Sequence, residues 1–227
     1  MILALTLFLT AIASYLLGSL NFSFIIPKRL RSIDIREVGS KNAGATNVTR
    51  NLGKRVGMFC MIMDILKGSM AVMFGFIIHW AMLGAPVGAN ITMFCGGFFA
   101  IAGHVFPLYY KFKGGKGVAT LGGAIIALDY RQAALLLVLF VLIIFISKMV
   151  SLGSVISASL YIPVIIVFEL FNPKHTVNSL IIRIVFAVLS ASLIIFMHRE
   201  NLERISKGTE RKIGEGNPHD EKKSTIF

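Results

Sequence analysis

Long charge-free stretches dominate this chain of 227 residues and restrict its fold more than any other feature. The first charged side chain is Lys28, and further uncharged runs cover 68–110, 117–128, 132–147, 149–168 and 184–198. A helix needs about 20 apolar residues to cross a bilayer, and 56% of all residues here are hydrophobic. The sequence therefore predicts an all-α integral membrane protein rather than a soluble globular domain.

The uncharged runs predict about seven transmembrane helices. The run 68–110 is long enough for two helices joined by a turn at 84–88. The run 117–128 is the weakest, because as a helix it would rise only about 18 Å, against a hydrocarbon core of about 30 Å. It must use flanking residues, tilt or form a re-entrant hairpin. The N-terminal run lacks the basic segment of a signal peptide, so we expect it to stay uncleaved.

The distribution of basic residues along the chain predicts the orientation of the protein in the membrane. With the N-terminus outside, most of the 23 lysines and arginines fall in the cytoplasmic segments. Three fall outside, namely Arg131, Lys174 and Arg183, and Lys67 interrupts an apolar stretch. Cytoplasmic loops carry an excess of lysine and arginine, so the sequence predicts an outer N-terminus and a cytoplasmic C-terminus. Attraction to anionic lipid headgroups accounts for part of the net charge of +12.

Two glycine-rich basic segments lie at this cytoplasmic face. The first, 39–47, is followed by Arg50 and combines hydroxyl, amide and guanidinium donors with two glycines. The second, 112–120, places three glycines around Lys116. Glycine lets backbone amides approach an anion, and lysine or arginine neutralises it, so both segments indicate phosphate binding. A solvated, turn-rich loop is the alternative for the first segment, and the second lacks the spacing of a nucleotide-binding P-loop.

A third polar stretch, 198–210, begins where the last apolar run ends. His198 and Asn201 share one face of a helix at headgroup level. An interfacial histidine that caps the last carbonyls is the alternative to a functional role for His198. Asp64 and Lys67, three residues apart in the second span, are expected to pair with each other, and intramembrane charges are candidates for function.

These motifs together resemble the bacterial acyl-phosphate:glycerol-3-phosphate acyltransferase family, PlsY. The resemblance covers residues 18 to 210 in order and spacing. It rests on Gly39-Ser40 through Arg50, Asp64 with Lys67-Gly68, Gly103-His104 through Thr120, and His198-Arg199-Glu200-Asn201 through Gly208-Thr209-Glu210. The family usually has glycine and proline where this chain has Lys41 and Ala43, which puts close backbone approach to phosphate at that point in question.

The resemblance implies one membrane acyltransferase domain over 1–210 in a bacterial inner membrane, with its active site facing the cytoplasm. The polar cytoplasmic tail, 211–227, is expected to be disordered and without a catalytic role. The implied reaction moves a fatty acyl group from acyl-phosphate to the 1-hydroxyl of sn-glycerol 3-phosphate, giving lysophosphatidic acid and phosphate. The implied partners are these two substrates, membrane lipids and the enzyme that forms acyl-phosphate. No nucleic acid, cofactor or metal is expected.

The resemblance also implies roles for individual residues. The expected catalytic-site contacts are Ser40, Arg50, Lys116, His198 and Asn201. The expected substrate-binding residues are Gly39, Asn42, Gly44, Thr46, Asn47, His104, Gly114, Gly115 and Gly117. His198 would orient or deprotonate the acceptor hydroxyl, but a substrate phosphate oxygen would serve equally as the base.

An acyl-phosphate is already activated, so its site needs cations and backbone donors rather than a nucleophilic relay. The chain has no histidine followed five residues later by aspartate, the pattern of thioester-dependent glycerolipid acyltransferases, and its two cysteines lie in separate apolar runs. A membrane transporter or binder of a phosphate-bearing anion is the alternative function. Discontinuous helices at the bilayer midplane and an internal repeat would favour it. A channel or scaffold would leave the glycine-rich motifs without a role.

Overall fold

The computed structural model describes residues 1–84, 90–171 and 176–215, and every regular element in these ranges is helical. Within these ranges, six segments are long and apolar enough to cross a membrane: Ile2–Arg31, Lys54–Leu83, Asn90–Tyr110, Tyr130–Ser147, Val150–Leu170 and Val177–Met197. The seventh apolar helix, Val118–Leu128, is the short one that the sequence predicts. The all-helical membrane architecture is therefore confirmed.

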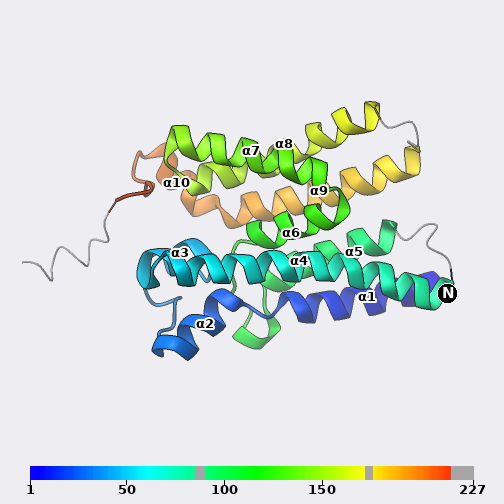
Figure 1. Ribbon diagram of the computed structural model, residues 1–227, viewed down its shortest axis with the longest axis horizontal. Coiled ribbons are helices and arrows are strands. Elements are labelled where there is room, and N and C mark those ends of the chain that lie inside the picture. Colours follow the sequence, from blue (N-terminus) through cyan, green and yellow to red (C-terminus); the bar gives the residue numbers. More distant parts are fainter. Residues whose placement is uncertain (85–89, 172–175, 216–227) are drawn as a thin grey trace, which may run out of the picture.

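The helices form two groups that run along one common axis (Figure 1). The first contains α1 (Ile2–Gly18), α4 (Lys54–Leu83) and α5 (Asn90–Val105), and the second contains α7 (Tyr130–Ser147), α8 (Val150–Leu170) and α9 (Val177–Met197). The short α6 (Val118–Leu128) packs on α4 and on α7, and α5 contacts α9. The two groups thus form one bundle with α6 between them.

Small residues let the helices of the first group approach closely. The face of α1 that packs against its neighbours is polar and small, with Thr6, Thr10, Ser14 and Gly18 all buried. A Cβ at Gly18 would overlap the backbone of Ala100 in α5. Close backbone approach through small residues is how membrane helices pack, because hydrophobic burial gives no driving force in lipid.

The N-terminal apolar run is interrupted, which the sequence does not predict. Helix α1 ends at Gly18, and the amphipathic α2 (Phe22–Arg31) follows after three residues. Asn21 caps α2, since its side-chain oxygen accepts a hydrogen bond from the amide of Phe24. The predicted run 1–27 is therefore two helices, and we call residues 19–21 the junction.

Other boundaries also differ from the uncharged runs. Helix α4 begins at Lys54 and carries Asp64 and Lys67 within it, so it starts before residue 68. Helix α9 begins at Val177 and includes Arg183. Charge marks these boundaries poorly because each of these side chains has a partner inside the bundle. The turn predicted at 84–88 lies, apart from Gly84, outside the described residues.

The polar segments collect at one end of the bundle. Helix α3 (Ala45–Leu52), helix α10 (Arg199–Ser206) and the start of the tail lie at the end opposite the N-terminus (Figure 1). The single-turn helix η1 (Leu108–Tyr110) belongs to the connection between α5 and α6. Part of the predicted disordered tail, 211–215, is described and its first residues are ordered against the bundle, because the amide of Ile213 donates to the carbonyl oxygen of Lys148 at 2.7 Å. The rest lies outside the described residues.

Candidate active site

The first glycine-rich loop is organised around Asn47 of α3. Its amide nitrogen donates to the carbonyl oxygens of Ile35, Val38 and Asn42 at 2.9, 3.0 and 3.1 Å. Its side-chain oxygen accepts from the backbone amide of Ser40 at 3.0 Å. Asn47 is buried and fully engaged with the loop. The structure thus shows it holding the loop in shape, and direct contact of Asn47 with substrate stays a prediction.

Several other residues of this loop lie nearer the surface. The side chains of Ser40 and Thr46 are exposed, and Gly44 is the N-terminal cap of α3. Gly39 has φ +60°, a conformation that suits glycine. Lys41 has φ +55°, the same left-handed region, in a residue whose Cβ makes that conformation costly. The backbone at Lys41 therefore takes a glycine-like shape although the glycine of the family pattern is absent.

The second glycine-rich loop folds back onto the end of α5. The amide of Gly114 donates to the carbonyl oxygen of Val105 at 3.2 Å, and that of Gly115 donates to the carbonyl oxygen of His104 at 3.1 Å. A Cβ at Gly115 would overlap the His104 ring. Gly117, with φ +83°, precedes α6. The structure thus gives Gly114 and Gly115 a packing role, and their contact with substrate stays a prediction.

Lys116, between these glycines, reaches the third polar stretch. Its ammonium donates a hydrogen bond to the side-chain oxygen of Asn201 in α10. The amide of Asn201 in turn donates to Glu210 at 2.6 Å. Glu210 also accepts from Ser151 at 2.7 Å and from Arg204 at 2.8 Å. Two expected site residues, Lys116 and Asn201, are therefore in direct contact, and Glu210 holds Asn201 in place.

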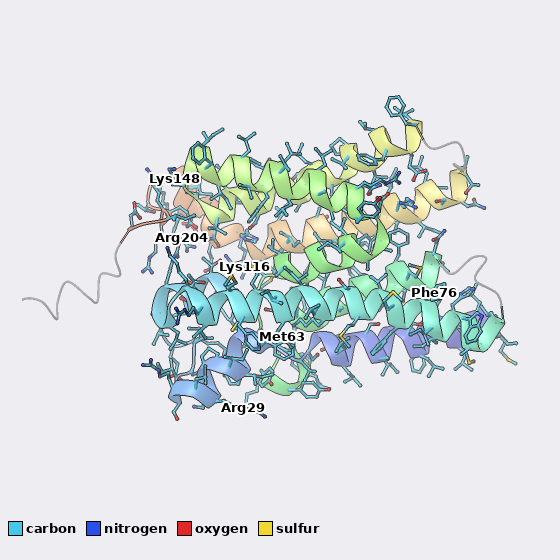
Figure 2. The ribbon with its side chains drawn as sticks, viewed as in Figure 1. Arg29, Met63, Phe76, Lys116, Lys148 and Arg204 are labelled. Atoms are coloured by element: carbon cyan, nitrogen blue, oxygen red, sulfur yellow. The ribbon has the colours of Figure 1, made fainter. Side chains whose placement is uncertain are left out.

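Four cations lie in the neighbourhood of Glu210: Arg204 contacts it, Arg50 and Lys116 feel its charge, and Arg211 follows it in the chain. We call these four residues the cation cluster. Lys116 and Arg204 lie at the same end of the bundle (Figure 2). Burial lowers the pKa of Lys116 to about 8, and burial together with the nearby positive charge of Arg211 lowers the pKa of Arg50. Burial is the larger cause of both shifts, and the neighbouring cations of the cluster add to it.

Among the described residues, only one member of the cation cluster has a carboxylate partner. Arg204 pairs with Glu210, whereas Arg50, Lys116 and Arg211 have no carboxylate within ion-pair distance in the part of the chain that the structure describes. Glu200 and Glu215 add acidic charge at the edge of the cluster, but both are exposed. Three partly buried cations without a matched anion form a site that favours a phosphate.

His198 lies between α9 and α10. Its Nδ1 is 2.8 Å from the carbonyl oxygen of Ile194, so Nδ1 carries the hydrogen and Nε2 has the free lone pair. Burial and the charge of Lys116 lower the pKa of His198 to about 4, so the ring is neutral at pH 7. The structure therefore shows the capping role left open above, and it also leaves Nε2 able to accept a proton.

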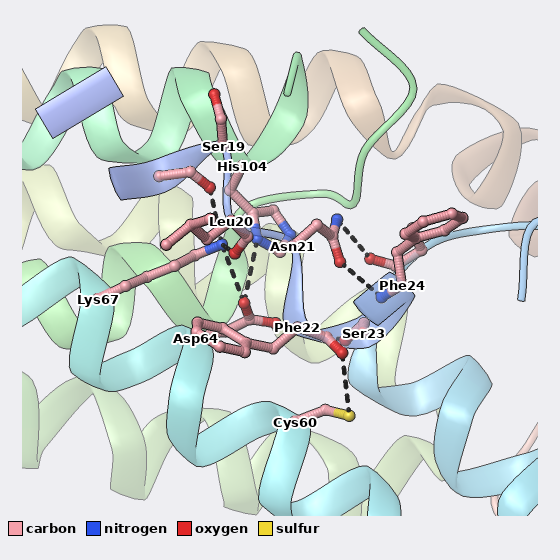
Figure 3. Close-up of polar contacts among 12 residues, drawn as sticks. Ser19, Leu20, Asn21, Phe22, Ser23, Phe24, Cys60, Asp64, Lys67 and His104 are labelled. Atoms are coloured by element: carbon pink, nitrogen blue, oxygen red, sulfur yellow. Dashed lines mark hydrogen bonds and ion pairs between the residues drawn. The ribbon is translucent and has the colours of Figure 1, made fainter. Parts of the chain in front are cut away.

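His104 lies deeper, away from the cation cluster. Its Nδ1 is 3.5 Å from Asp64, and Asp64 pairs with Lys67 at 3.0 Å, which confirms the expected pairing of these two residues (Figure 3). All three side chains are buried. The substrate contact expected of His104 stays a prediction, and the structure shows it bound to the interior of the bundle.

The sequence reasoning missed four residues of the site: Ser151, Arg204, Glu210 and Arg211. Arg204 and Glu210 lie in the third polar stretch without a predicted role, and Arg211 lies in the tail that is expected to have no function. Ser151 lies near the start of the uncharged run 149–168 and gives no sequence signal beyond its hydroxyl. Within the described ranges, no three histidine, cysteine, aspartate or glutamate residues are placed to hold a metal ion, and Cys60 and Cys95 are unpaired.

Comparisons with known proteins agree on one family. Residues 8–208 match the family model described as glycerol-3-phosphate acyltransferase. Proteins of that name from Ureaplasma urealyticum and Acholeplasma laidlawii are 37% and 40% identical, over 92% and 90% of this chain and 90% and 91% of their own lengths. The crystal structure of PlsY, an integral membrane glycerol 3-phosphate acyltransferase in its glycerol 3-phosphate form, is 33% identical. It superposes with a TM-score of 0.75 over 92% of this chain and 96% of its own. The chain therefore belongs to the glycerol-3-phosphate acyltransferase family.

Proposed function

We propose that the protein transfers a fatty acyl group from acyl-phosphate to the 1-hydroxyl of sn-glycerol 3-phosphate, releasing lysophosphatidic acid and inorganic phosphate. The observation that carries this proposal is the cation cluster, in which Arg50, Lys116 and Arg211 lack a carboxylate partner among the described residues. Both substrates carry phosphate, so such a site can hold the leaving group of the donor and the phosphate of the acceptor.

The residues suit the chemistry of an activated donor. The hydroxyl oxygen of the acceptor attacks the carbonyl carbon, and the bond from this carbon to the bridging oxygen breaks. The electron pair leaves with the phosphate, whose negative charge Lys116 and Arg50 stabilise. The hydroxyl proton passes to Nε2 of His198 or to a phosphate oxygen, and the neutral state of His198 supports the first route.

Most of the expected residues then have a task, and the substrate contact expected of His104 stays a prediction. Arg50 binds phosphate through its guanidinium fork, and Lys116 binds it as a point charge. Asn201 orients the ammonium of Lys116. Ser40, on the exposed side of the first loop, offers its hydroxyl to a substrate phosphate. The other expected contacts act through the shape of the two loops: Gly39, Asn42, Gly44, Thr46, Asn47, Gly114, Gly115 and Gly117.

The active site faces the cytoplasm of a bacterial inner membrane in this proposal, with the N-terminus outside. The support is the excess of lysine and arginine at the end that holds the loops and α10. A soluble enzyme that forms acyl-phosphate would then deliver the donor from the same side. A cysteine introduced at Ser32 should react with an impermeant thiol reagent only after the cytoplasmic face is opened, and labelling from outside intact cells would contradict the orientation.

The alternative, a transporter or binder of a phosphate-bearing anion, would be favoured by discontinuous helices. The junction between α1 and α2 is one such break, but the carbonyls of Gly18 and Leu20 already accept hydrogen bonds from Lys67. These carbonyls are therefore engaged in holding the break, whereas a transport site would offer them to its substrate. Family membership also favours the transferase.

Purified protein with defined donors tests the proposal. Acyl-phosphate and glycerol 3-phosphate together should yield phosphate and lysophosphatidic acid in equal amounts, and neither substrate alone should do so. Acyl-CoA or acyl carrier protein should give no product, since the site is built for a phosphate leaving group. Comparable turnover with a thioester would exclude the proposed donor, and binding of glycerol 3-phosphate without product would favour the alternative.

A further inference from the structure

A buried polar network lies beneath both glycine-rich loops and has no part in the reaction described above. It consists of Asp64 and Lys67 in α4, His104 in α5, and the junction at residues 19–21 (Figure 3). Ionisable side chains within a membrane are costly and need a reason for their presence. We call this set the junction network.

Lys67 stabilises the break in the N-terminal helix. Its ammonium donates to the carbonyl oxygens of Gly18 and Leu20, both at 2.9 Å, and pairs with Asp64 at 3.0 Å. The end of a helix leaves carbonyls without intrahelical partners, and lipid offers none. Lys67, near the middle of α4, therefore lets α1 end inside the bundle, and Asp64 balances its charge.

The junction is tied to the first glycine-rich loop. Asn21 caps α2, and its amide nitrogen donates to the carbonyl oxygen of Ala43 at 3.2 Å. Ala43 is fully buried and lies between the expected site residues Ser40 and Arg50 along the chain. A shift of the junction would therefore displace this loop through the hydrogen bond between Asn21 and Ala43.

The second glycine-rich loop depends on the same network. His104 contacts Asp64 through Nδ1, and its ring lies where a Cβ of Gly115 would be, next to Lys116. The amide of Leu108 donates to the hydroxyl of Ser19 in the junction at 3.2 Å. The hydroxyl of Tyr15, one turn earlier in α1, donates to the carbonyl oxygen of Phe106 at 2.7 Å. Both loops are thus held in place by contacts that lead to the junction network.

We propose that Asp64 and Lys67 are positioning residues for acyl transfer: they set the placement of the two glycine-rich loops relative to each other. This inference rests on the proposed function for its kinetic test. When two reacting groups must meet, a displacement of about 1 Å can cost about a hundredfold in rate, while each group still binds its own phosphate. Loss of the network should therefore lower kcat more than it raises KM.

The principal variant is the double substitution Asp64→Asn with Lys67→Met. It removes both charges together, so that no single buried charge is left unpaired and the protein can fold. It also removes the donor to Gly18 and Leu20. We expect kcat to fall about tenfold to a hundredfold, with KM for each substrate within about threefold of the parent value. The single variant Asp64→Asn, if it folds, should show the same split.

Glu169→Gln is the matched control. Glu169 forms a buried ion pair with Arg183 at 3.2 Å in the same bundle, between α8 and α9 and far from the loops. Its loss should lower the thermal unfolding midpoint without changing kcat or KM. A change in kcat for Glu169→Gln as large as that for the double variant would mean that any buried ion pair affects the rate, and would overturn the inference.

A distance measurement decides the inference without any activity. Spin labels at Lys41 and Lys113, two exposed lysines in the first and second loops, report the separation of the loops in protein whose Cys60 and Cys95 have been replaced by alanine. The double variant should broaden or shift the distance distribution, and Glu169→Gln should leave it narrow. An unchanged distribution, or full kcat, in folded double variant overturns the inference. If the parent protein shows no acyl transfer, the proposed function fails, and the distance distribution still tests the positioning.

Discussion

The cation cluster and the junction network both place charged side chains within a helical membrane protein, but they balance the charges differently. In the junction network, Lys67 has a carboxylate and two carbonyl oxygens as partners. In the cation cluster, Arg50, Lys116 and Arg211 lack carboxylate partners among the described residues. A balanced network stabilises a shape, whereas unmatched cations indicate an anion that arrives from outside. The difference separates structure from function within one bundle.

The largest effect is expected at Lys116, which links the second glycine-rich loop to α10. Lys116→Ala removes the cation and its hydrogen bond to Asn201, so kcat/KM should fall by about a hundredfold to a thousandfold. Steady-state kinetics with acyl-phosphate and glycerol 3-phosphate measure this. Lys113→Ala, an exposed lysine in the same loop, is the control and should change kcat/KM little. Equal losses in the two variants would mean that general basic charge, rather than the cluster, matters.

Arg50 tests whether shape matters as well as charge. Arg50→Lys keeps a cation but loses the guanidinium fork, so kcat/KM should fall by about tenfold to a hundredfold, or about 1.4 to 2.8 kcal/mol. Arg55→Lys, at an exposed position in α4, is the matched control. Full activity of Arg50→Lys in folded protein would reduce Arg50 to a determinant of membrane orientation.

The pH dependence of kcat/KM should report the protonation of Lys116 in the cation cluster. Lys116 has a pKa of about 8 and binds phosphate only when protonated, so activity should fall about tenfold per unit above pH 8. His198 has a pKa of about 4 and is neutral above it, so protonation of His198 should not limit activity between pH 5 and 8. The second ionisation of a phosphate monoester, near pH 6, contributes a separate limb. A constant kcat/KM up to about pH 9.5 would show that Lys116 does not need its charge.

Substitution of Glu210 is expected to lower the stability of the protein. Glutamine in its place keeps one acceptor oxygen but turns a second amide donor toward Arg204, so Glu210→Gln should cost about 2 kcal/mol of unfolding free energy. The hydrogen bonds of Ser151, Asn201 and Arg204 lower the pKa of Glu210, against the effect of burial. Its contribution is therefore complete above the ordinary pKa of about 4.3 and is lost as the pH falls through the lowered value.

Thermal unfolding in detergent, at neutral and at low pH, measures the contribution of Glu210. The difference between parent and variant should shrink as the solution becomes acidic. Glu203→Gln, which breaks the exposed pair of Glu203 with Lys207, is the control and should cost less than about 1 kcal/mol. A loss for Glu210→Gln no larger than that of the control would remove Glu210 from the support of the site.

The smallest expected effect concerns Lys41. A left-handed conformation costs a non-glycine residue about 1 kcal/mol, and glycine relieves this strain but loses more entropy on folding. Lys41→Gly should therefore raise the unfolding free energy by at most about 1 kcal/mol and leave kcat/KM unchanged. A large loss of activity would show that the Lys41 side chain binds substrate and belongs with the cation cluster.

The sequence predicts much of the architecture because uncharged runs and basic loops record the constraints of a bilayer directly. It does not predict the junction, since no charge or proline marks residues 19–21, and the break depends on Lys67 from another helix. The sequence also does not predict that α4 starts before residue 68. Asp64 and Lys67 look like the end of an apolar run in the sequence, but they neutralise each other within the bundle.

Within the site, the contact of Lys116 with Asn201 joins two of the predicted residues. The motifs could not show that Ser151 and Arg204 converge on Glu210, because those contacts join α8, α10 and the segment that follows α10. They also could not separate residues that face a substrate from residues that shape a loop. Asn47 illustrates this limit, because its four hydrogen bonds to the loop depend on how the backbone folds around it.

The central claim is that the cation cluster stabilises phosphate as it leaves an acyl group, and the fate of one oxygen atom tests it most directly. Acyl-phosphate labelled with oxygen-18 at the bridging position is incubated with glycerol 3-phosphate and the purified protein, and both products are analysed by mass spectrometry. Attack at the carbonyl carbon predicts that every label appears in inorganic phosphate and none in lysophosphatidic acid. Label in the lipid product, or phosphate release that does not require glycerol 3-phosphate, would contradict the account.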